Sequence, residues 1–363
     1  MGRKMRYGII GCGMIAQEHI RNLAITRDVD VVAIADPVAD SIAMTKANLG
    51  DAGATVRVYA NAADLARDAE IDAVIVSSPN FTHRDTLAPL FETNLHILCE
   101  KPLATTLEDA KWVTAKAARH AGIFWTAMEY RFMPPAAAFI EQVHAERIGR
   151  LAMLFIREHR FPFLPKIGDW NRFSENTGGT MVEKCCHFFD LMRLITKSEP
   201  VRVYCSGAMD VNHLGESYGG RTPDIIDNSY TTVDFANGVR AMLDLSMFAD
   251  GAENQEEITA VGDKARLDML VPESSIVFSP RTGFMAAKQP ERMHIAVDGA
   301  ALAAGTHHGS IFYQHQAFLA AARGDGPVVV SAEDGLRAVA IGIAAEISAK
   351  EKRVVEMSEL GIA

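Results

Sequence analysis

The stretch MRYGIIGCGMIAQEHIRNLAITRDVDVVAIAD, residues 5–36, decides how the chain begins to fold. It opens with a short, mostly apolar strand, and Val29–Ala35 is a second, largely apolar strand. Between them, apolar residues recur at helical spacing from Ile15 to Leu23. The stretch therefore predicts a strand, a glycine turn, a helix and a second strand that ends at Asp36.

The glycine turn has the pattern G-x-G-x-x-A. Gly11 permits the tight turn, Gly13 lets backbone N–H groups approach a pyrophosphate, and Ala16 keeps helix and strand close. Asp36 lies about twenty residues beyond the turn, where a carboxylate accepts hydrogen bonds from ribose hydroxyls. The stretch predicts a dinucleotide site, and it favours NAD over NADP because Asp36 would repel a 2′-phosphate.

The whole chain has an ordinary globular composition. Its 363 residues suffice for two domains, and a net charge of -10 argues against a nucleic-acid surface. No run of about eighteen apolar residues is present to span a membrane. The five cysteines lack a C-x-x-C motif and fit a reducing compartment. We expect a soluble cytoplasmic protein that binds neither nucleic acid nor membranes.

Strands and helices alternate up to residue 126. Strands are predicted at 56–59, 73–77, 96–99 and 123–126, and helices at 38–49, 62–67, 85–93 and 107–120. This rhythm predicts an α/β domain over residues 1–128, a doubly wound parallel sheet of the Rossmann type. Ligands of such a sheet bind at the carboxyl ends of its strands, where Ser78–His83 and Glu100–Pro102 follow predicted strands.

Strands dominate from residue 129 onward. They are predicted at 151–158, 201–207, 229–235, 239–248, 258–261, 266–270 and 275–278, with helices at 134–146, 312–323 and 332–350. Asn237-Gly238 predicts a hairpin, whereas 210–224 and 281–306 are predicted as loops. We expect an α+β domain over 129–363 with a large, mostly antiparallel open sheet, whose uncovered face suits subunit association.

Two stretches carry residues suited to proton transfer. Lys101 follows a strand end, where partial burial and the positive nicotinamide of NAD⁺ would lower its pKa; the alternative is a solvated lysine. In residues 178–190, GGTMVEKCCHFFD, Glu183 and His187 are four residues apart and share a helix face. His187 suits a general base, or it is a core histidine. Thr180-x-x-Glu183 also fits a capping box.

Other kinds of site are disfavoured. Adjacent residues on a helix point about 100° apart, so Cys185 and Cys186 cannot both turn toward one ion with His187. We therefore predict no metal site. A Ser-His-Asp hydrolase of the G-x-S-x-G type is not indicated either, because that motif is absent.

The chain resembles the glucose–fructose oxidoreductase / inositol dehydrogenase / MocA (Gfo/Idh/MocA) family. The motifs that carry the resemblance are Gly11–Ala16, Asp36, Ser78–His83, Glu100-Lys101-Pro102, Arg131-Phe132, Gly178-Gly179 with His187 and Asp190, and the closing stretch Ser331–Val355. The resemblance implies a Rossmann domain, a second domain with a large open sheet, and homodimers or homotetramers built through that sheet. It also implies NAD(P)-dependent redox chemistry on sugars, cyclitols or related polyols.

The resemblance assigns roles residue by residue. Lys101 and His187 resemble the catalytic lysine and histidine, and Glu183 falls where the family usually has Asp. Lys101, Arg160, His187 and Tyr313 are expected to contact substrate. The residues expected to bind the cofactor are Gly11, Gly13, Met14, Ile15, Asp36, Ser78, Pro79, Asn80, His83, Glu100, Lys101, Trp170 and Arg172.

The segment at 157–166 bears on the substrate class. It is basic and aromatic, so an acidic sugar could be held by Arg157, Arg160 or Lys166; a solvated loop is the alternative. Taken together, the sequence predicts an NAD-dependent dehydrogenase of a sugar, cyclitol or sugar-acid hydroxyl. A redox-neutral NAD-dependent glycosidase and a non-catalytic NAD and sugar sensor are the alternatives, although a sensor has no need of both Lys101 and His187.

Overall fold

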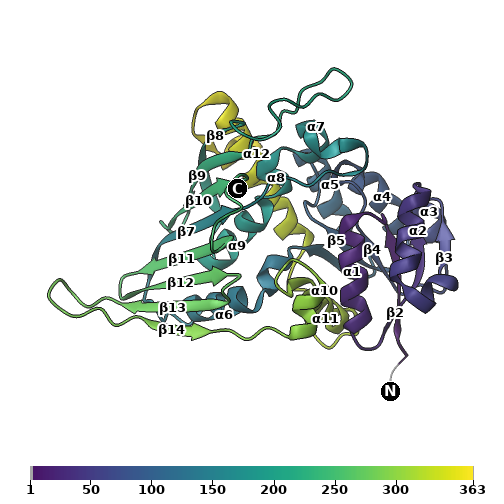
Figure 1. Cartoon of the computed structure of the whole chain (residues 1–363), viewed down its shortest axis with the longest axis horizontal. Coiled ribbons are helices and arrows are strands. Elements are labelled where there is room, and N and C mark those ends of the chain that lie inside the picture. The colour runs from purple at the N-terminus through teal and green to yellow at the C-terminus, as the bar shows by residue number, and fades with distance from the viewer. Residues whose placement is uncertain (1–2, 363) are drawn as a thin grey trace. The chain divides into compact units, whose positions relative to one another are not determined.

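The computed structural model describes residues 3–362, which form two compact units (Figure 1). The first unit combines the residues up to Phe132 with Asp298–Val339. The second combines Met133–Val297 with the residues from Ala340 onward. Residues 298–339 thus fold with the first unit, whereas the predicted boundary at 128/129 places them in the second domain.

The first unit contains a six-stranded parallel sheet in the order β3-β2-β1-β4-β5-β6. Its strands are β1 (Met5–Ile10), β2 (Val29–Ala35), β3 (Arg57–Tyr59), β4 (Ala73–Val76), β5 (His96–Glu100) and β6 (Phe124–Ala127). The order reverses between β1 and β4, which marks the ligand-binding edge of a doubly wound sheet. The predicted Rossmann-type sheet is confirmed.

The helices of this unit join and cover the strands. They are α1 (Met14–Ile25), α2 (Ala39–Asn48), α3 (Ala62–Leu65), α4 (His83–Leu90), α5 (Leu107–Ala117), α10 (Gly299–Ala304), α11 (Ser310–Ala322) and the first turns of α12 (Ala332–Glu351). The Thr106 side chain caps the start of α5 by accepting the Asp109 N–H. Phe318 of α11 packs against Tyr7 and Trp125, so a late segment completes this core.

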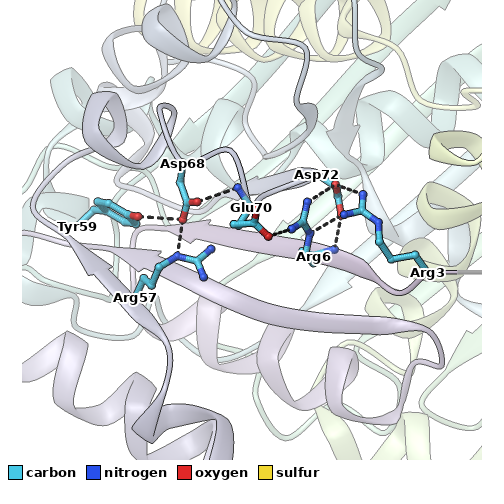
Figure 2. A network of polar contacts seen from close by, with 7 residues as sticks. All are labelled: Arg3, Arg6, Arg57, Tyr59, Asp68, Glu70 and Asp72. Atoms are coloured by element: carbon cyan, nitrogen blue, oxygen red, sulfur yellow. Dashed lines mark hydrogen bonds and ion pairs between the residues drawn. The ribbon is translucent and has the colours of Figure 1, made fainter.

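Charged side chains join the strands at their amino ends, as Figure 2 shows. Arg6 of β1 bonds Asp72, which directly precedes β4, through Nε at 3.2 Å and Nη2 at 3.1 Å, and it also pairs with Glu70. Arg3 donates to the same Asp72 carboxylate at 2.7 Å. The basic start of the chain is therefore balanced by acids, at the end of the sheet opposite the glycine turn.

The second unit contains a nine-stranded sheet in the order β14-β13-β12-β11-β7-β10-β9-β8-β15 (Figure 1). Its strands are β7 (Leu151–His159), β8 (Pro200–Ala208), β9 (Asn228–Phe235), β10 (Arg240–Ser246), β11 (Glu256–Gly262), β12 (Ala265–Val271), β13 (Ser275–Pro280), β14 (Glu291–His294) and β15 (Val355–Glu356). In the part of the chain that the structure describes, β7–β10 is the only parallel pair of this sheet, so the predicted mostly antiparallel sheet is confirmed.

Helices cover one face of this sheet. They are α6 (Pro134–His144), α7 (Ser174–Thr177), α8 (Thr180–Glu183), α9 (Cys186–Thr196) and the end of α12, whose Ser348 hydroxyl accepts the Cys205 N–H of β8. The opposite face exposes apolar side chains in the single chain: Met153 is 55% exposed and Tyr230 63%. Among the described residues, no helix combines the length and apolar character that a membrane span needs.

The prediction of a loop over 281–306 is wrong in part. This segment contains β14 and α10. The side chains of β14 are mostly exposed and polar, because it is the edge strand of the sheet, so it lacks the apolar alternation that reveals a strand. Helix α10 has only six residues and is capped by Asp298.

Candidate active site

The glycine turn lies at the carboxyl end of β1. Gly11 has φ +88°, and a Cβ there would lie 2.5 Å from backbone atoms of Ser77 and Ser78. Its N–H donates to Ala35 O at 2.9 Å. At Gly13, by contrast, nothing in residues 3–362 beyond Gly13 and its chain neighbours lies within 4 Å of the place a Cβ would take. Gly11 is therefore required by the fold, while Gly13 leaves open space in front of the start of α1.

Asp36 contacts the same turn. Its Oδ2 accepts the Cys12 N–H and its Oδ1 accepts the Val38 N–H, both at 2.7 Å. These bonds hold the carboxylate beside the glycine turn. A carboxylate has about four acceptor positions, so Asp36 can still accept hydrogen bonds from ribose hydroxyls.

The turn after β4 brings further predicted residues to this edge. Asn80 is buried, and its Nδ2 has no hydrogen-bond partner among the described residues. The ring of His83 is fully buried, with Nδ1 2.9 Å from Pro102 O and Nε2 3.2 Å from Ser78 O, and this burial lowers its pKa. His83 thus connects the turn after β4 to the turn after β5, and the Asn80 amide offers an unused donor at the same edge of the sheet.

Glu100 ends β5 beside Lys101. Its Oε2 accepts the Lys101 N–H at 3.2 Å, and its Oε1 lies 2.9 Å from His19 Nε2. His19 Nδ1 in turn lies 2.9 Å from His315 Nε2. Burial opposes ionisation of Glu100, but the hydrogen bond and charge of His19 and the charge of Lys101 outweigh it and lower its pKa. Lys101 therefore follows a buried, ionised carboxylate.

Glu129 is a functional candidate that the sequence prediction missed. It lies buried just after β6, whose Ala127 pairs with Glu100 of β5. Burial and the negative charge of Glu100 raise the pKa of Glu129 to about 7. An acid directly after the strand neighbouring Glu100 was the available signal, since the ends of parallel strands meet at one edge.

In the second unit, Glu183 and His187 lie on two separate short helices. Glu183 ends α8, and His187 is the second residue of α9; both side chains are buried. The predicted capping box of Thr180 and Glu183 is wrong. Gly179, not Thr180, precedes the first helical residue, and the Thr180 hydroxyl donates to Ile226 O at 2.6 Å.

A carboxylate from a distant helix takes the capping position instead. Glu346 of α12 accepts the Met181 N–H through Oε1 at 2.9 Å. Gly179 has φ +89°, and a Cβ there would overlap the Glu346 carboxylate, which explains a glycine at this position. Burial raises the pKa of Glu346 to about 7.

We expect this buried acid to make the protein less stable as pH rises. The pKa of Glu346 is higher in the folded chain than its ordinary 4.5, so its stabilising contribution is present below pH 4.5 and lost as pH rises through 7. The free energy of unfolding should therefore fall between pH 5 and pH 8. Glu346→Gln should make this fall smaller by ~2 kcal/mol. Urea unfolding at pH 5 and pH 8 measures it. Glu333→Gln, an exposed acid on the same helix, should keep the wild-type dependence.

The remaining predicted cofactor residues of the second unit, Trp170 and Arg172, lie in the short helical segment Ile167–Arg172. Arg172 Nε lies 3.1 Å from Glu216 Oε2, at a hollow of about 520 Å³ between residues 161–165 and 211–216. Its buried Nη1 has no hydrogen-bond partner among the described residues. Lys166 Nζ lies 4.9 Å from the centre of the Trp170 ring. Arg172 thus lines the hollow, and it keeps one buried donor without a partner among the described residues.

Tyr313 lies in the first unit, on α11. Its hydroxyl oxygen accepts the Asp298 N–H at 3.1 Å, next to the start of α10. The structure therefore gives Tyr313 a contact within its own unit, and its predicted role toward substrate stays a prediction.

The three cations proposed to hold an acidic sugar each lie near a carboxylate. Arg157 pairs with Asp244 at 3.1 Å, Arg160 lies 3.6 Å from Glu158, and Lys166 lies 3.9 Å from Glu183. Their charges are thus partly balanced within the second unit. Among residues 3–362, no group of three or more His, Cys, Asp or Glu side chains is arranged to hold a metal ion.

Comparisons with known proteins identify both halves of the chain. Residues 5–128 match the Gfo/Idh/MocA oxidoreductase family with an NAD-binding Rossmann fold, and residues 140–357 match that family's C-terminal α/β domain. A myo-inositol 2-dehydrogenase of Thermotoga maritima is 28% identical over 98% of this chain and 99% of its own.

Solved structures agree with this family match. A probable dehydrogenase from Thermotoga maritima has a TM-score of 0.78 and 27% identity, covering 98% of this chain and 100% of its own. A levoglucosan dehydrogenase in complex with NADH and levoglucosan has a TM-score of 0.85 at 18% identity, with the same coverage, and shows the shared fold. From its nucleotide-binding sheet to its large open sheet, the chain belongs to the Gfo/Idh/MocA family of NAD(P)-dependent oxidoreductases.

Proposed function

We propose that the protein is an NAD-dependent dehydrogenase that oxidises a hydroxyl of a sugar, cyclitol or sugar acid to a ketone, or catalyses the reverse reaction. The observation that carries the proposal is the placement of Glu100 and Lys101 on the edge of the Rossmann sheet that holds the glycine turn and Asp36. Relatives described as myo-inositol 2-dehydrogenase and scyllo-inositol 2-dehydrogenase (NAD(+)) support the substrate class.

The described residues fit NAD. Gly13 leaves space for the pyrophosphate, the Asp36 carboxylate suits the ribose hydroxyls, and the Asn80 amide offers an unused donor. NAD, when bound, supplies the hydride acceptor for the alcohol. Asp36 would repel a 2′-phosphate, so we propose NAD rather than NADP.

We expect Gly13→Ala to keep the stability of the wild type and to weaken NADH binding at least about tenfold, a loss of ~1.4 kcal/mol. The added methyl enters open space in the protein but occupies the place proposed for the pyrophosphate. Thermal unfolding and fluorescence titration with NADH measure the two effects. The matched variant Gly11→Ala should unfold at lower temperature, because its Cβ meets the backbone of Ser77. Wild-type NADH affinity in Gly13→Ala would contradict the proposed pyrophosphate site.

The chain's own residues supply the proton transfer in this proposal. His187 accepts the hydroxyl proton as the alcohol is oxidised, and Glu183 orients its ring. Lys101 stabilises the developing alkoxide as a cation or shares the proton. Trp170 and Arg172 are proposed to contact the cofactor, and Tyr313 the substrate.

The test is a panel of inositols, neutral sugars and sugar acids with NAD⁺ and NADP⁺, followed by NADH absorbance. A dehydrogenase forms NADH in proportion to ketone. A redox-neutral glycosidase forms product without net NADH, and a sensor binds both ligands without product. We propose that Arg160 favours anionic substrates. Equal activity on neutral and anionic sugars, unchanged in Arg160→Ala, would refute this preference.

We also propose that the protein works in the cytoplasm as a homodimer or homotetramer. The uncovered face of the nine-stranded sheet, which exposes Met153 and Tyr230, supports association through that face. Light scattering on the wild type and on Tyr230→Lys tests it, since a buried lysine at such an interface should dissociate the oligomer.

A further inference from the structure

The helical segment that carries Glu183 and His187 is interrupted between them. Thr180 O accepts the N–H groups of both Lys184, at 3.0 Å, and Cys185, at 3.2 Å, so the turn there is wide. Cys185 O then accepts the N–H groups of both Phe188, at 2.9 Å, and Phe189, at 3.0 Å, where α9 begins. Such local changes of helical pitch are frequent at functional sites. The interruption sets how His187 is turned relative to Glu183.

A buried ion pair holds the chain at this interruption. Lys184 is only 4% exposed, and its Nζ lies 2.9 Å from Oε1 of Glu158, which is fully buried in β7. The same oxygen lies 3.6 Å from Arg160 Nη1. Lys184 Nζ also lies 5.4 Å from the centre of the Phe188 ring. The side chain of Lys184 is thus directed into the unit, between α9 and the sheet.

A second carboxyl belongs to the same cluster. Glu256 of β11 lies directly opposite Glu158 in the strand register and is also buried. Its Oε1 accepts a hydrogen bond from the Gln255 amide at 2.6 Å. Burial, together with the charge of Glu158, raises the pKa of Glu256 to about 7. Of these two carboxyl groups, Glu158 is the one that pairs with Lys184 at 2.9 Å, with Arg160 beside it.

Stability alone does not explain such a pair. Taking both charges out of water costs several kcal/mol, and well-packed apolar residues of similar volume often stabilise a protein as well or better. In some proteins a buried pair of this kind is retained because it fixes one arrangement of the chain. Here Lys184 lies in the chain between Glu183 and His187, where α8 ends and α9 has not yet begun.

We propose that Lys184 and Glu158 are positioning residues, whose buried ion pair sets the interruption between α8 and α9 and thereby the orientation of His187 toward Glu183. This inference rests on the proposed function, in which His187 exchanges the hydroxyl proton. Lys184 and Glu158 themselves act only through that segment.

The test compares Lys184→Met, Glu158→Leu and the double variant in the full-length protein. Each single variant removes the 2.9 Å partner of a buried charge, so its melting temperature should fall. The double variant should recover the wild-type melting temperature and NADH affinity, yet turn over at one tenth of the wild-type kcat or less. Full recovery of kcat along with stability would show that the pair is only structural and would overturn the inference.

A second readout does not depend on turnover. The ¹⁵N chemical shifts of the His187 ring, assigned with His187→Gln, should differ between the wild type and the double variant, and unchanged shifts would overturn the inference. If the double variant does not fold, Glu158→Gln is tested instead, since it removes the charge but keeps the shape of the side chain. Wild-type His187 ring shifts and a wild-type kcat in this variant would overturn the inference. A wild-type protein without dehydrogenase activity refutes the proposed function, while the ring shifts still test the positioning role.

Discussion

Lys101→Ala is expected to lower kcat about 1,000-fold while leaving NADH affinity within about threefold of the wild type. Lys101 follows β5 on the cofactor-binding edge of the sheet, directly after the buried carboxylate of Glu100. In the proposed reaction it stabilises the alkoxide, an interaction that is strongest in the transition state, so kcat falls rather than substrate affinity. Steady-state kinetics and NADH fluorescence titration measure the two quantities.

The control for this variant is Lys116→Ala, a half-exposed lysine in the same unit that lies 3.4 Å from the exposed Glu92. Its kcat should equal that of the wild type. Near-full turnover in Lys101→Ala would remove Lys101 from the mechanism. A large loss of NADH affinity instead would mean that Lys101 holds the cofactor.

Features that depend on neighbouring residues in the chain were predictable from the sequence. The six parallel strands follow from local apolar runs, and the caps at Asn61 and Thr106 follow from their position just before helices. Ser331 and Asp334, three residues apart, likewise make reciprocal bonds at the start of α12. Each of these depends on contacts within a few residues, which a single sequence displays.

Features that depend on distant residues were not predictable. The carboxylate that caps α8 comes from Glu346, which lies 165 residues after Met181 in the chain, so the local sequence offered only Thr180 as an alternative cap. His19 was predicted only as part of a helical pattern, yet it joins Glu100 to His315 inside the first unit. No local pattern indicates which of several polar residues meet across a fold.

The same limit applies to the candidate site itself. The resemblance to a family pointed to Lys101 and His187, and periodicity placed them at a strand end and on a helix. The interruption before His187, however, depends on Lys184 reaching Glu158 in β7. Because a continuous helix was the simplest expectation from the sequence, the geometry between Glu183 and His187 required the structure.

His187→Ala is expected to lower kcat/KM about 1,000-fold, because it removes the group proposed to accept the hydroxyl proton. The ring is 2% exposed, so its loss also leaves a cavity and should cost ~1–3 kcal/mol of unfolding free energy. Turnover must therefore be measured well below the variant's melting temperature. NADH affinity should stay within about threefold of the wild type, since the cofactor is proposed to bind at the glycine turn.

The matched control is His144→Ala. His144 lies on α6 of the same unit, and its Nε2 lies 2.9 Å from Leu194 O of α9. It should lose stability but keep kcat/KM, which separates packing from proton transfer. Added imidazole should restore part of the activity of His187→Ala, because the cavity admits a small base, and should leave His144→Ala unchanged. Wild-type kcat/KM in His187→Ala would exclude His187 as the base and leave Lys101 as the proton acceptor.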